Sequence, residues 1–199
     1  MVEIYLFVNP LDELCLLSEQ RFLEAIEHEE TKVYLKLIPI LNPLIIHHYL
    51  IDNNYPTNDL VFRNHLIETV YSACLDVKAA QLQGKKMGRK FLFHLQNLVG
   101  KEKMAYSDEL VDMILTKINA DKETFKLDRQ SKLIKEFFKI DQQIANEMGI
   151  NRFAKAVIFN YDSTRNFGVL IDAFSSTDLI KQLLKVEHTQ TNYAKLLEH

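Results

Sequence analysis

The chain has 199 residues, of which 47% are apolar and 26% are charged, and its formal net charge is −3. This is an ordinary globular composition without the basic excess of a nucleic-acid-binding surface, and its two cysteines are too few for a secreted disulfide scaffold. No apolar run reaches membrane-spanning length and the N-terminus lacks the marks of a signal peptide, so we expect a cytoplasmic protein without a nucleic-acid or membrane partner.

The first forty residues predict a strand, a helix and a second strand. Residues 3–8 are nearly all apolar, which is typical of a strand buried on both faces. From Asp12 to about Glu29 the apolar residues recur at helical spacing, and Cys15 lies on their stripe. Residues 31–38 alternate between polar and apolar, which indicates a more exposed strand at a sheet edge. Parallel pairing of the two strands is the default for this order.

Residues 53–148 carry no strand signal and predict helices only. Thr57 is the expected cap of the first of these helices, and Ser107 is the expected cap of the third. The four helices are expected over residues 57–83, 89–99, 108–119 and 128–148.

The period changes back to that of strands after residue 149. Residues 156–161 and 167–173 are two β-prone runs joined by a short polar link, which favours an antiparallel hairpin. Ser175 and Ser176 then supply caps for a last helix, expected from Thr177 to about residue 186 with a continuation toward residue 197.

The element order predicts an α/β fold in which one sheet carries helices on its faces. Residues 1–52 and 149–199 would form this βαβ–ββα domain. Residues 53–148 would form an all-helical subdomain inserted between the two halves.

This order resembles the DsbA-like thioredoxin-fold family, whose active site opens the first helix. Residues 9–15 (NPLDELC) are similar to the Pro-Leu-Cys-x-x-Cys segment of the cytoplasmic YjbH/SpxH adaptors of Gram-positive bacteria, and residues 78–86 are similar to a helix of their insertion. Those adaptors deliver the regulator Spx to the ClpXP protease. The resemblance therefore implies a protein partner here, a Spx-like regulator together with ClpX, and a place in the bacterial stress response.

The resemblance places Asp12 where the family has its attacking cysteine and leaves only Cys15 at the resolving position. A carboxylate favours a helix N-terminus for the reason that a thiolate does, so we expect Asp12 to accept the N–H of Leu14 or Cys15. Burial and the Asp12 charge should both disfavour a Cys15 thiolate. A buried structural thiol is the favoured interpretation of Cys15 and of Cys74, and whether the two approach each other is left open.

The loop before the third strand is a second departure from the family, which carries a cis-proline there. By alignment that position falls on Ala154 or its neighbour Phe153. A cis peptide without proline costs about 2.5–4 kcal/mol, so we expect a trans loop of a different shape. Because the family holds extended substrate at this loop, the change also weakens a thiol-exchange activity.

Other polar clusters carry less weight. Lys85, Lys86 and Arg89 form a basic cluster that is either a solvated face or a dock for an acidic partner. His47 and His48 lack the i, i+4 spacing of helical metal ligands, and we expect neither a metal nor a cofactor.

Three functions remain in order of preference. The first is a redox-inactive DsbA-like binding protein, an adaptor that delivers a Spx-type regulator to ClpXP. The second is a thiol-disulfide oxidoreductase or isomerase with a degenerate site that uses Cys15. The third is a glutathione-dependent isomerase or transferase, in which Asp12 would repel the glutathione thiolate.

Overall fold

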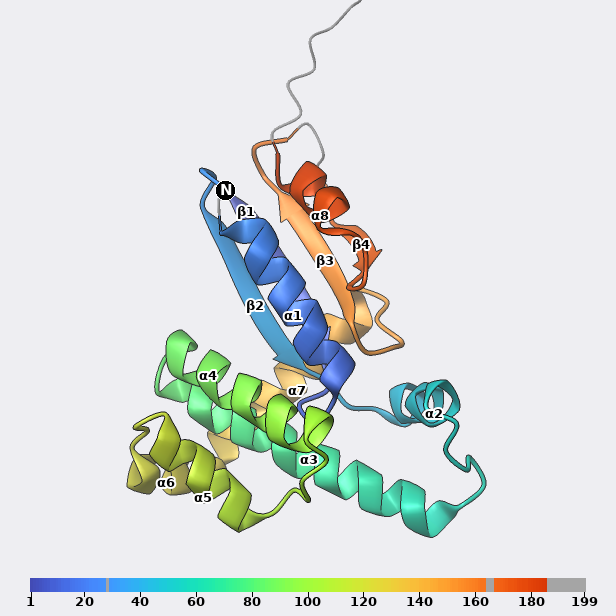
Figure 1. The fold of residues 1–199 in the computed structure, drawn as a ribbon, viewed down its shortest axis with the longest axis vertical. Helices are drawn as coiled ribbons and strands as arrows, with labels where there is room; N and C mark the ends of the chain where they lie inside the picture. The colour runs from blue at the N-terminus through green and yellow to red at the C-terminus, as the bar shows by residue number, and fades with distance from the viewer. Residues whose placement is uncertain (28, 164–166, 186–199) are drawn as a thin grey trace, which may run out of the picture.

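The computed structural model describes residues 1–27, 29–163 and 167–185. A four-stranded sheet in the order β2-β1-β3-β4 forms its centre (Figure 1). β1 pairs in parallel with β2 and antiparallel with β3, and β3 pairs antiparallel with β4. The strands are β1 (Val2–Val8), β2 (Val33–Pro39), β3 (Lys155–Asn160) and β4 (Val169–Asp172). The predicted βαβ unit and C-terminal hairpin are confirmed, and β2 is an edge strand as its alternating pattern indicated.

Helices cover both faces of this sheet. α1 (Glu13–Ile26) and α8 (Thr177–Leu184) lie against each other on one face, as Figure 1 shows. The other helical segments follow β2 and precede β3 in the chain. They are α2 (Pro43–Asp52), α3 (Leu60–Leu82), α4 (Lys85–Leu95), the π-helix η1 (Gln96–Lys101), α5 (Asp108–Lys117), α6 (Lys122–Gln130) and α7 (Lys132–Glu147). The α/β fold class with a helical insertion is therefore confirmed.

The side chains of β1 enter the apolar cores on both faces of the sheet. Ile4 and Leu6 lie in the core beneath α1, and Phe7 lies in the core on the other face with Ile45 of α2 and Ala145 of α7. Each of these side chains of β1 is fully buried, and such burial typically contributes about 1.5–3 kcal/mol per large apolar side chain. The run of apolar residues in β1 is therefore explained by the burial of the strand on both faces of the sheet.

Several helix boundaries differ from the sequence prediction. Asp59, not Thr57, caps α3, because its carboxylate accepts the N–H of Phe62 at 2.9 Å. The interruption before α4 is only Gln83 and Gly84, and Gly84 has a φ of 120°, which glycine tolerates. The helix expected over 128–148 is broken at Ser131, which ends α6 and caps α7.

The last helix is capped by Ser176, whose hydroxyl accepts the N–H of Leu179 at 3.2 Å. Its expected continuation beyond residue 185 lies outside the described residues. Within the part of the chain that is described, no helix combines the length and the apolar character that crossing a membrane requires.

Candidate functional site

Asp12 caps the start of α1 as predicted. Its Oδ1 accepts the backbone N–H of Leu14 at 2.7 Å and that of Cys15 at 3.1 Å. The residue is 8% exposed, and burial raises the pKa of its carboxyl although these hydrogen bonds and the charge of Lys103 act in the opposite direction. The helix N-terminus, where a thiolate would be stabilised, is therefore occupied by a carboxyl group.

Cys15 is fully buried one helical turn further on. Its Sγ accepts the backbone N–H of Asn9 at 3.2 Å. Burial and the charge of Asp12 raise the pKa of the Cys15 thiol well above its ordinary value, as the sequence predicted. Cys74 is also buried, and both thiols are free. The arrangement gives Cys15 neither the solvent access nor the ionised form that a nucleophile needs.

The loop before β3 packs against the Cys15 thiol. The backbone of Ala154 acts to lower the pKa of this thiol, and Ala154 N–H donates to the carbonyl of Phe7 at 3.1 Å. Ala154 has a φ of 55°, and the peptide bonds of the described residues are all trans. The loop therefore presents a left-handed alanine beside the thiol, a conformation that is uncommon for a residue with a side chain.

Tyr49 completes this cluster, and sequence reasoning missed it. Its hydroxyl interacts with Asp12 and lowers the pKa of that carboxyl, and burial raises the pKa of Tyr49 strongly. Its ring lies edge-on to that of Phe153, with the centroids 5.8 Å apart. We define the Asp12 cluster as Asp12, Cys15, Tyr49, Phe153 and Ala154, which come from the start of α1, from α2 and from the loop before β3.

The π-helix η1 closes over the start of α1. A Cβ atom at Gly100 would lie 2.6 Å from the backbone nitrogen of Glu13, so only glycine permits this approach. The Gln96 side chain donates to Glu19 Oε1 at 3.0 Å and to the Asn9 carbonyl at 3.2 Å. Burial raises the pKa of Glu19 to about 8. Within the Asp12 cluster, Asp12, Cys15 and Ala154 are thus buried, whereas Tyr49 and Phe153 are half-buried.

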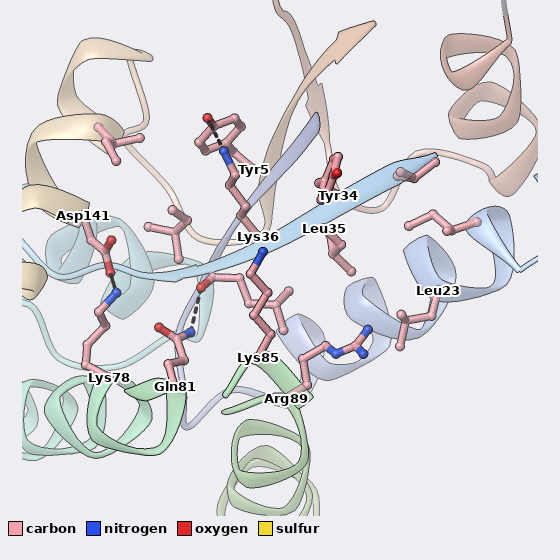
Figure 2. Close-up of a pocket in the computed structure, with 15 residues that line it drawn as sticks. Tyr5, Leu23, Tyr34, Leu35, Lys36, Lys78, Gln81, Lys85, Arg89 and Asp141 are labelled. Atoms are coloured by element: carbon pink, nitrogen blue, oxygen red, sulfur yellow. Dashed lines mark hydrogen bonds and ion pairs between the residues drawn. The ribbon is translucent and has the colours of Figure 1, made fainter. Parts of the chain in front are cut away.

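The basic cluster lies elsewhere. Lys85 and Arg89 line a groove of about 520 Å³ beside residues 33–38 of β2, and Figure 2 shows the Lys85 side chain directed toward that strand. Lys86 is exposed and does not line the groove. None of the five residues of the Asp12 cluster lines it either. The basic groove and the Asp12 cluster are therefore separate regions of the structure.

We expect the protein to show no insulin-reducing turnover comparable with that of an ordinary thioredoxin. The reason is that Asp12 cannot attack a disulfide and Cys15 is buried with a raised thiol pKa. The measurement is insulin reduction with dithiothreitol, beside a thioredoxin as positive control. Turnover that disappears in Cys15→Ser would contradict this expectation.

The sheet order, the helical insertion and the capped start of α1 define a protein of the DsbA-like thioredoxin-fold class. The chain belongs to the thioredoxin family, because the model of the family described as thioredoxin matches residues 5–182.

Curated relatives include proteins named as ClpXP adapter protein SpxH. The protein of that name from Bacillus cereus is 37% identical over 118 residues, which cover 59% of this chain and 39% of the relative. The one from Staphylococcus saprophyticus is 29% identical over 167 residues, which cover 81% of this chain and 56% of the relative. The chain thus spans only about two fifths to just over half of the length of these relatives.

Solved structures share the fold at low identity. The oxidoreductase DsbA from Xylella fastidiosa matches with a TM-score of 0.63 and 6% identity, over 92% of this chain and 81% of that one. The cytosolic disulfide reductase DsbM from Pseudomonas aeruginosa matches with a TM-score of 0.60 and 14% identity, over 92% and 96% of the two chains. Likeness at this identity establishes the architecture and leaves the function to the site.

Proposed function

We propose that the protein is a redox-inactive, DsbA-like binding protein of the cytoplasm that acts as an adaptor between a Spx-type regulator and the ClpXP protease. The relatives named SpxH support this proposal. In it, Asp12 and Cys15 are the relic of a redox site, and the protein works by binding rather than by thiol exchange.

The observation that carries the proposal is the state of the start of α1. A carboxyl group at Asp12 accepts the two N–H bonds that would otherwise stabilise a thiolate. The remaining thiol, Cys15, is fully buried and its pKa is raised. Both features favour a structural role for these residues.

The alternative of a thiol-disulfide oxidoreductase or isomerase that uses Cys15 draws on the fold neighbours, which include a disulfide reductase. It would require Cys15 to become exposed and ionised against its burial and against the charge of Asp12. A glutathione-dependent activity would meet the same negative charge at Asp12. We therefore rank both below the adaptor.

The test of the proposal is direct binding of a purified Spx-type regulator, with and without ClpX, at two salt concentrations. We expect binding that weakens at the higher salt concentration and weakens further on charge reversal at Lys85 and Arg89, because these exposed cations have no ion-pair partner among the described residues. Absence of binding at tens of micromolar would reject the Spx assignment.

A further inference from the structure

The outer edge of β2 carries backbone groups that the sheet does not use. β2 pairs with β1 on one side only. Val2 N–H donates to the Lys32 carbonyl at 2.9 Å, and Ile40 N–H donates to the Val8 carbonyl at 3.2 Å. The N–H and C=O groups of successive residues point to opposite sides of a strand. These bonds therefore show that the backbone N–H and C=O groups of the even-numbered residues of β2 point toward β1, and that those of the odd-numbered residues point outward.

Among the described residues, side chains form hydrogen bonds with the outward backbone groups of β2 only at its C-terminal end. The Gln81 amide donates to the outward carbonyl of Leu37 at 3.1 Å, and the Gln142 amide donates to that of Pro39 at 3.1 Å. Over the described residues, no hydrogen bond reaches the outward N–H and C=O groups of Val33 and Leu35. A stretch of open strand edge is therefore left, and such an edge is a template for a further strand.

The groove beside this open edge has an excess of positive charge. Its one lining carboxylate, Asp141, is bound by Lys78 at 2.7 Å, and Lys36 is bound by Glu3 at 3.1 Å. Lys85 and Arg89 have no carboxylate within ion-pair distance in the described part of the chain. Figure 2 shows Lys85 rising from α4 to β2 and Arg89 turning from α4 toward α1. The groove therefore favours carboxylates.

Apolar side chains supply the remaining contacts. Leu23 and Ile26 of α1 and Leu35 of β2 line the groove. Leu23 is 42% exposed, which leaves apolar surface for a ligand to cover. Open backbone groups, apolar contacts and unpaired cations together match a segment that is extended, partly apolar and acidic.

We propose that the outer edge of β2 binds an extended acidic segment of a partner protein as an additional strand of the sheet. Its backbone pairs with the outward groups of Val33 and Leu35, and its carboxylates meet Lys85 and Arg89. The identity of the partner rests on the proposed function, whereas the binding mode rests on the geometry of this edge.

The test uses a ten-residue synthetic peptide that alternates valine and glutamate, with a valine–lysine peptide of the same length for comparison. Amide exchange followed by NMR should show that the acidic peptide protects the N–H groups of Val33 and Leu35, and calorimetry should show that the lysine peptide binds at least about tenfold more weakly. Equal binding of the two peptides, or unprotected amides at both residues, would overturn the proposal.

Two matched double variants distinguish an effect of the groove from an effect of the protein's net charge. Lys85→Glu with Arg89→Glu should weaken binding of the acidic peptide by about tenfold or more, because both cations line the groove. Lys86→Glu with Lys90→Glu makes the same charge change on the same helix at exposed residues outside the groove, and it should change binding by less than about threefold. Equal weakening by the two pairs would contradict the proposed docking mode.

A third variant tests the backbone contact alone. Leu35→Pro removes an outward N–H and leaves the hydrogen bonds to β1 in place, a substitution that edge strands tolerate. It should weaken binding of the acidic peptide, and unchanged binding by the folded variant would count against strand addition. If the peptide fails while an intact Spx-type regulator binds, the edge proposal is rejected and the adaptor proposal stands. If the peptide binds and the regulator does not, the reverse holds.

Discussion

An Asp12→Cys variant is expected to form a disulfide with Cys15 under mild oxidation and to leave Cys74 as its only free thiol. The side chain of Asp12 already folds over the first turn of α1, since its Oδ1 lies 3.1 Å from the Cys15 backbone nitrogen. Cysteines at these two positions recreate the C-x-x-C arrangement at a helix N-terminus, where a thiolate is stabilised. Thiol counting after denaturation measures the outcome.

The matched control for this variant is Leu14→Cys. Leu14 is 50% exposed and directly precedes Cys15, and adjacent residues of a helix do not face each other. In the monomeric fraction its added thiol should therefore stay free. Persistently free thiols in Asp12→Cys under the same oxidant would show that the start of α1 is not arranged as described.

A Glu19→Gln variant is expected to be more stable than the wild-type protein at neutral pH. Burial raises the pKa of Glu19 from 4.5 to about 8, so between these values the unfolded chain ionises while the folded protein keeps its proton. The unfolded state then binds fewer protons, and stability falls by about 1.4 kcal/mol for each pH unit until pH 8. At pH 7 the accumulated loss is on the order of 3 kcal/mol, and the neutral amide avoids it.

Urea unfolding at pH 5, 7 and 8 tests this expectation. Glutamine still offers an oxygen to the Gln96 amide, so the substitution should keep this hydrogen bond. The stability advantage of Glu19→Gln should be small at pH 5 and should grow toward pH 8, because the wild-type protein loses stability over this range. The matched control is Glu24→Gln, an exposed residue of the same helix, which should leave the pH profile unchanged. A Glu19→Gln protein that is less stable than the wild type at pH 7 would contradict the account of a buried, protonated Glu19.

The elements with a clear local signal were predictable from the sequence. The apolar run of β1 and the alternation in β2 predicted both strands, and the polar face of β2 correctly placed it at an edge. The break at Ser131 was missed because residues 128–148 keep a helical apolar period on both sides of it. The π-helix at 96–101 was missed because its cause is tertiary, the close approach of Gly100 to the start of α1.

In the candidate site, too, the features with a local sequence signal were predictable and those that depend on tertiary packing were not. The cap at Asp12 and the burial of Cys15 follow from residue type and spacing, and both are present in the structure. Tyr49 lies 37 residues from Asp12, and only the packing of α2 beside the start of α1 brings its hydroxyl to the carboxylate. The alignment of Lys85 and Arg89 with the open edge of β2 likewise depends on how α4 packs. The division into domains at residues 52 and 149 stays a prediction.

Under the proposed function, the protein binds a regulator without using thiol chemistry. The most direct test of this proposal is the dissociation constant of a purified Spx-type regulator for the wild-type protein and for Cys15→Ser, measured side by side by calorimetry under reducing conditions. We expect binding by both, with dissociation constants within about threefold, because the buried thiol forms no part of a contact surface. Binding by the wild-type protein that Cys15→Ser abolishes, in a variant that is still folded, would contradict it.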